Sequence, residues 1–105
     1  MHRAAGSDKA ESTDITRFLS AIGEPMRLQI LYLLGDQGRR NVGDIASQFR
    51  LSRPAISHHL KVLKDAGVLA SEKVGQEVYY WLERERIVAT LRALADAAAS
   101  FRCGE

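Results

Sequence analysis

The sequence predicts a mainly α-helical domain that carries one small β-hairpin, and three features lead to this fold class. Apolar residues recur at helical spacing over most of residues 13–67 and again over residues 84–101. Between these stretches, residues 68–82 are rich in Val, Tyr and Trp and are interrupted by Gly75-Gln76, which is typical of two strands and a tight turn. A chain of 105 residues suits a single domain of this kind.

The amino-terminal part of the chain predicts a tail and then a helix. Residues 1–12 are polar and rich in small side chains, so we expect a flexible tail there and a folded domain over residues 13–102. Thr13 or Asp14 can cap the first helix. Its apolar side chains, Ile15, Phe18, Leu19 and Ile22, form one stripe.

A second and a third helix follow. The second begins at Glu24-Pro25, since proline is tolerated in a first turn, and a turn is expected at residues 35–38. The second helix is apolar around much of its circumference, which predicts a central place in the core. Asn41 can cap a short third helix over residues 42–49.

The fourth helix, over residues 53–66, is amphipathic and basic on its outer face. Ser52 can cap it, and Gly67 can supply the left-handed residue that ends it. Two helices joined by a tight turn, the second basic outside, form a helix-turn-helix. The outer face predicts a helix that lies in a DNA groove, although most amphipathic helices are simply solvated on that side.

The predicted DNA contacts gather on this helix and on the hairpin that follows it. Between Ile45 and Lys64 the chain has four Lys or Arg residues and no acid. This local excess of positive charge is stronger evidence for a nucleic-acid partner than the net charge of +2. The hairpin at residues 69–82 is then a wing beside the helix. The residues expected at the DNA are Ser52, Arg53, Pro54, Ser57, His58, Lys61, Lys64, Lys73 and Gln76. Tyr79, Tyr80 and Trp81 can either stack on bases or pack against the domain, and we favour packing.

The last helix, over residues 84–100, predicts a homodimer. Its apolar residues Ile87, Leu91, Leu94, Ala98 and Phe101 follow one another at spacings of four and three, as in a coiled-coil seam. The alternative is that this seam packs against the first helix of the same chain. Together with the stripe on the first helix, these residues form the predicted dimer interface.

The sequence resembles the ArsR/SmtB family of bacterial winged-helix repressors. Three stretches carry the resemblance, GEPMRLQILYLL from Gly23, LSRPAISHHLKVLKDAGVL from Leu51 and EKVGQEVYYWL from Glu72, within a match over residues 18–82. The resemblance implies a winged helix-turn-helix, homodimeric through its first and last helices. It also implies a repressor of transcription that binds an imperfect palindrome in double-stranded DNA. The alternative is a winged-helix module that binds another protein.

The metal ligands of the best-known family members are missing. Their third helix carries a pattern like CVCDL, and the matching stretch here, residues 42–46, has no thiol. Their last helix pairs acids with histidine, whereas this one has Asp96 and no histidine. We therefore expect no metal site and no cofactor. Cys103 can cross-link two chains, be modified by an oxidant or be idle, and an idle cysteine is favoured.

Other function classes find no support in the sequence. Ser57 and His58 diverge on a helix, and no glycine-rich elbow, phosphate loop or dinucleotide motif is present, so no catalytic residues are predicted. No apolar run approaches the roughly 20 residues that span a bilayer, and residues 1–14 lack the apolar segment of a secretory signal. We expect a cytoplasmic protein without a membrane partner, and no pattern identifies a small-molecule or redox effector.

Overall fold

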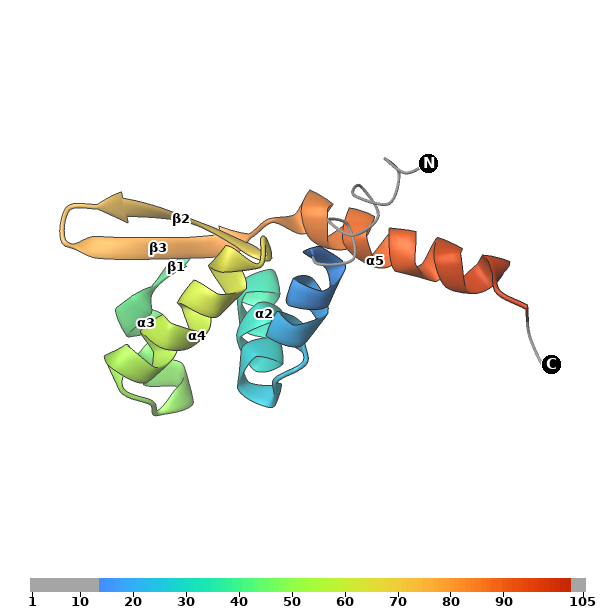
Figure 1. The fold of residues 1–105 in the computed structure, drawn as a ribbon. Coiled ribbons are helices and arrows are strands. Elements are labelled where there is room, and N and C mark those ends of the chain that lie inside the picture. The colour runs from blue at the N-terminus through green and yellow to red at the C-terminus, as the bar shows by residue number, and fades with distance from the viewer. Residues whose placement is uncertain (1–13, 103–105) are drawn as a thin grey trace.

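The computed structural model describes residues 14–102, and it has the predicted fold class. The predicted tail at residues 1–12 and Cys103 lie outside the described residues. A helix over residues 14–22 leads into the elements labelled in Figure 1, which are α2 (Pro25–Gln37), β1 (Arg40–Asn41), α3 (Val42–Phe49), α4 (Arg53–Asp65), β2 (Leu69–Val74), β3 (Glu77–Leu82) and α5 (Arg84–Ser100).

The helix ends follow from the capping residues that the sequence predicts. The Ala55 N–H donates to the Ser52 hydroxyl oxygen at 3.2 Å, and the Asp44 N–H donates to the Asn41 side-chain oxygen at 2.8 Å. Each bond satisfies a first-turn donor that has no partner within its helix. Gly67 has a φ of +83°, so it is the left-handed residue that stops α4.

Helix α2 is longer than predicted, because the expected turn at residues 35–38 is helical as far as Gln37. The Gly38 N–H donates to the Leu34 carbonyl oxygen at 2.8 Å, and Gly38 leaves the helix with a φ of +81°. The Gln37 side chain also bonds to Gln48 of α3 at 3.0 Å. The backbone bond and this tertiary contact both stabilise a last turn that the composition of residues 35–38 alone would not favour.

The sheet contains one strand more than the predicted hairpin. Its order is β1-β3-β2, and both pairs are antiparallel. Strands β2 and β3 pair from Leu69 opposite Leu82 to Val74 opposite Glu77, which confirms the hairpin. The additional strand β1 has two residues and pairs Arg40 with Tyr80. It ties the start of α3 to the wing.

The core lies between the helices and the base of the sheet. Buried side chains from four helices and from β2 meet there, and the largest of them are Phe18, Ile30, Leu34, Ile45, Ile56, Leu60, Leu63 and Val68. Helices α3 and α4 lie below the wing, whereas α5 extends away from the rest of the protein (Figure 1). No helix in residues 14–102 combines the length and the apolar character that crossing a bilayer requires.

Candidate nucleic-acid interface and dimer surface

Helix α4 presents one buried and one exposed face, in the rotation that its sequence predicts. Ile56, Leu60 and Leu63 are fully buried. All seven residues predicted to contact DNA from this helix and its cap are exposed: Ser52, Arg53, Pro54, Ser57, His58, Lys61 and Lys64. The outer face therefore carries cations, a hydroxyl and an imidazole that are accessible to a ligand.

His59 is half-buried on the side of α4 that faces α2. Its Nδ1 lies 3.3 Å from Nη1 of Arg27, so a ring without a proton on Nδ1 accepts a hydrogen bond there. The Arg27 Nε donates to the Ala21 carbonyl oxygen at 2.7 Å. One arginine thus joins three helices, and His59 has a structural setting distinct from that of exposed His58.

Lys61 is available to a phosphate although it has a partner in the protein. Its Nζ lies 3.3 Å from the Asp65 carboxylate, one helical turn on, and both side chains are more than half exposed. An exposed pair of this kind contributes about 0–1 kcal/mol. A DNA phosphate can replace Asp65 at little cost.

The wing places two further predicted residues at its exposed end. Lys73 and Gln76 are exposed, on either side of the turn where Gly75 adopts a φ of +63°. Glu77 begins β3, and one of its carboxylate oxygens lies 3.8 Å from Nη2 of Arg53. The wing and α4 therefore meet through their side chains.

Arg39 braces the outer face of the wing, a role that the sequence did not suggest. Its guanidinium lies 5.0 Å from the ring centre of Tyr79 and 4.8 Å from that of Trp81, and it bonds to Glu72 of β2 at 2.7 Å. The neighbouring Tyr80 points to the other face and packs against the core. Burial raises the pKa of the Tyr80 phenol. All three aromatic residues pack within the protein.

We expect Arg39→Ala to lower the free energy of unfolding by about 1–2 kcal/mol, since it removes two cation–π contacts and an exposed ion pair. Denaturant unfolding followed by Trp81 fluorescence measures this loss. Arg40→Ala is the matched control, because its guanidinium donates only to the Arg39 carbonyl oxygen among the described residues. Equal losses in both variants would show that Arg39 does not brace the wing.

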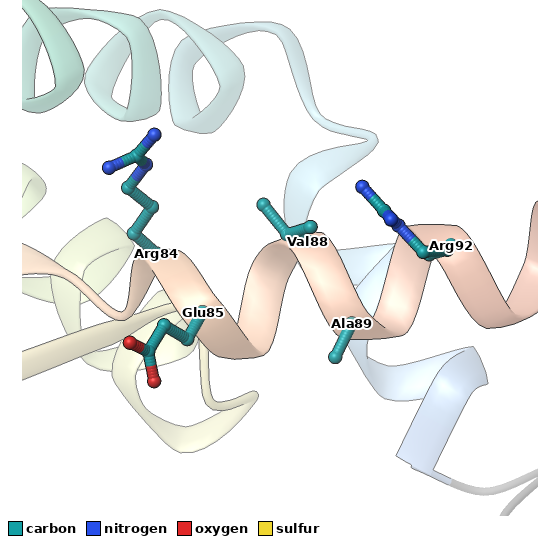
Figure 2. A pocket seen from close by; sticks show the side chains of 5 residues that line it. All are labelled: Arg84, Glu85, Val88, Ala89 and Arg92. Atoms are coloured by element: carbon teal, nitrogen blue, oxygen red, sulfur yellow. The ribbon is translucent and has the colours of Figure 1, made fainter.

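Helix α5 carries apolar side chains that the described elements leave partly exposed. None of its residues is buried, and Leu91, Leu94 and the C-cap residue Phe101 are 41%, 38% and 66% exposed. Val88, which the predicted seam omitted, is 43% exposed. Figure 2 shows it between Arg84 and Arg92, and these three residues with Glu85 and Ala89 line a shallow pocket along α5. An apolar surface of this extent suits a protein partner.

The helix over residues 14–22 contributes to the same surface. Asp14 and Ile15 line a shallow depression together with Ala89, Thr90 and Ala93, so this helix lies beside the first half of α5. Leu19 is 37% exposed. The remaining predicted interface residues, Ile22, Ile87 and Ala98, are half-buried or exposed.

Phe18 differs from the prediction that it lies at the dimer interface. Its side chain is 2% exposed and belongs to the core, together with Ala21. The stripe of the first helix is wide enough to serve two surfaces, and Phe18 occupies the inner edge. It is therefore not part of the surface that a second copy can contact.

Metal-ligating side chains do not gather anywhere in residues 14–102. No group of three or more His, Cys, Asp or Glu residues in this range is placed to hold a metal ion. His58 and His59 have ring centres 5.9 Å apart, with their planes tilted by 55°, and they diverge from α4.

Comparisons with known proteins agree with this architecture. A family model described as bacterial regulatory protein, arsR family, matches residues 24–71, from the cap of α2 to β2. The chain is 48% identical over 62 residues to the transcriptional repressor SdpR of Bacillus subtilis (strain 168), and this match covers 59% of the chain and 68% of that repressor.

Solved structures resemble the chain over a larger part of its length. One is described as a possible transcriptional regulator for arsenical resistance; it is 40% identical with a TM-score of 0.68, covering 76% of this chain and 81% of its own. Another, from Mycobacterium bovis, is described as a homodimeric winged helix-turn-helix DNA-binding domain; it is 26% identical with a TM-score of 0.69, covering 99% and 92%. This protein therefore belongs to the arsR family of bacterial regulatory proteins.

Proposed function

We propose that this protein is a homodimeric repressor of transcription that binds a palindromic operator through α4 and the β2–β3 wing. The observation that carries the proposal is the outer face of α4. It combines exposed cations and hydrogen-bonding side chains next to a wing, with Asp65 as its only acid. A face of this kind matches the phosphates and base edges of a DNA major groove.

The residues on this face take different roles according to their chemistry. Arg53, in the first turn of α4, has the planar fork that fits O6 and N7 of guanine. Ser57, one turn on, can bond to a base or a phosphate. Phosphates are contacted by the charged side chains of Lys61, Lys64 and Lys73. His58 adds a hydrogen bond in the groove, and Gln76 adds one to the DNA from the tip of the wing.

The exposed surface of α5 supports a dimer. A second copy would cover Leu91, Leu94 and Phe101, which water otherwise contacts. The similar domain from Mycobacterium bovis is described as homodimeric. A two-fold dimer presents two α4 helices to successive major grooves, with half-sites about 34 Å apart.

Salt dependence distinguishes this proposal from a module that binds protein. We expect duplexes selected from a random pool to share an imperfect palindrome and to bind with an affinity that falls steeply with ionic strength. Lys61→Ala should weaken binding to all sequences alike and lower the salt slope by about one unit. Filter binding at several salt concentrations measures both quantities.

The control for this measurement is Arg17→Ala, which removes an exposed cation from the helix over residues 14–22. It should leave the salt slope unchanged. Failure to select any duplex, or an affinity without salt dependence, would contradict the proposal and favour a protein partner for α4.

A further inference from the structure

The guanidinium of Arg53 is held between three elements. It projects from the first turn of α4, and its Nη2 lies 3.8 Å from Oε1 of Glu77, the first residue of β3. Its Nη1 lies against Gly43, the second residue of α3. The side chain that is best suited to read a base is therefore placed by both the wing and the other helix of the helix-turn-helix.

Gly43 provides the space for this arrangement. A Cβ at residue 43 would lie 2.6 Å from Nη1 of Arg53, closer than carbon and nitrogen atoms tolerate. The first turn of α3 carries partial positive charge, which disfavours a cation there. Asp44 in the first turn of α3 and Glu77 of the wing are negative groups that offset this repulsion, and of the two Glu77 lies within 4 Å of the guanidinium.

Glu77 has an unusual environment for a wing residue. Its Oε1 is buried and has no hydrogen-bond partner among the described residues, although the side chain as a whole is 43% exposed. A buried carboxylate oxygen without a hydrogen bond is unfavourable unless a nearby charge compensates it. The group that provides this compensation is Arg53.

We propose that Glu77 is a positioning residue that orients the Arg53 guanidinium toward the acceptor edge of a guanine. This inference rests on the proposed function, because it assigns the specificity of the same DNA-binding surface. The guanidinium has five N–H donors, and a guanine edge accepts from only two of them. Glu77 can therefore remain paired with Arg53 while the solvent-facing edge of the guanidinium donates to the base. The Arg53 side chain is 58% exposed, which leaves that outer edge accessible.

Pairing with Glu77 favours a base over a phosphate for two reasons. An arginine that is already restrained loses less rotamer freedom when it binds, and it binds in one orientation. The pair also has no net charge, so its attraction to phosphates of any sequence is weaker than that of a free arginine. Glu77 therefore lowers affinity for unrelated DNA and increases discrimination at one base pair.

A double-mutant cycle tests this role. The four proteins are the unmodified chain, Glu77→Gln, Arg53→Ala and the double variant, each titrated with the selected operator and with an unrelated duplex. A third duplex carries a change at the base pair where Arg53→Ala relaxes preference. In Glu77→Gln we expect discrimination at that base pair to fall by roughly 2- to 10-fold and affinity for unrelated DNA to rise.

In the Arg53→Ala background, Glu77→Gln should cause no further loss of discrimination, because the glutamate acts through the arginine. Gly43→Ala supplies an independent displacement of the guanidinium without a change of charge. It should reduce discrimination while leaving affinity for unrelated DNA close to that of the unmodified protein. Melting temperatures of all variants report whether the fold is retained.

Two results would overturn the proposal. Glu77→Gln could keep full discrimination at the base pair that depends on Arg53, or it could change discrimination equally with and without Arg53, which would mean that Glu77 acts on DNA directly. An unmodified protein that selects no duplex would instead overturn the proposed function, and the role of Glu77 with it.

Discussion

Replacing Leu91 and Leu94 together by glutamate is expected to convert the protein to a monomer and to abolish high-affinity operator binding. Both side chains are exposed apolar groups on α5, so the substitutions should spare the fold of the protomer. Four glutamates would then face one another across the dimer axis, where unpaired buried charge is costly. Sedimentation gives the mass, and titration with the operator gives the affinity.

The loss of affinity follows from the two-fold symmetry of the site. Each protomer reads one half-site, and linking two readers raises the overall affinity by about 10²–10⁴ over one reader. Ser100→Glu is the control, since this exposed residue lies on the opposite side of α5 from Leu91 and Leu94 and the substitution adds a negative charge to the same helix. A Leu91→Glu/Leu94→Glu protein that stays dimeric would show that the interface lies elsewhere.

The parts of the fold that local sequence rules determine were predicted correctly. The spacing of Ile56, Leu60 and Leu63 gave the rotation of α4, and Ser52 and Gly67 gave its ends, because capping and periodicity depend only on near neighbours. The β2–β3 hairpin was predicted for the same reason, since its turn is two residues long.

The features that were missed depend on residues far apart in the chain. Strand β1 has two residues, too few for a periodic pattern, and it forms because Arg40 meets Tyr80 across the sheet. The last turn of α2 carries a contact between Gln37 and Gln48, which lies eleven residues later on α3. Phe18 belongs to the core for a similar reason, since a stripe on one helix does not say which neighbour covers it.

In the candidate site, too, local features were predicted and contacts between distant residues were missed. Exposure of the cations on α4 follows from the helical period. The partners of the arginines do not follow from it. Glu77 reaches Arg53 on α4 from a strand 24 residues later, and Arg39, which precedes β1, reaches Glu72, Tyr79 and Trp81 across the wing. One sequence signal could have drawn attention to this cluster: Gly43 is a glycine inside a short predicted helix. In the structure it lies against the Arg53 guanidinium.

Two substitutions seven residues apart on α4 are expected to have opposite effects. Leu60 is fully buried, so Leu60→Ala should lower the free energy of unfolding by roughly 2–5 kcal/mol, a large part of the stability of so small a domain. Its melting temperature should fall by about 10 °C or more. Leu60→Met, which keeps the volume of the side chain, should cost less than about 1.5 kcal/mol.

Arg53→Ala should leave the fold intact and weaken the operator complex. Arg53 is exposed, and the Glu77 side chain is 43% exposed, so water can reach the Glu77 carboxylate once the guanidinium is removed. The free energy of unfolding should therefore change by less than about 1 kcal/mol. Operator affinity should fall by about 1–3 kcal/mol, and preference at one base pair should relax, because the bidentate contact to guanine is lost. Melting curves and operator titrations of both variants distinguish the buried face of α4 from the face that contacts DNA. A protein with Arg53→Ala that melts early while binding DNA normally would place the reading face elsewhere on the domain.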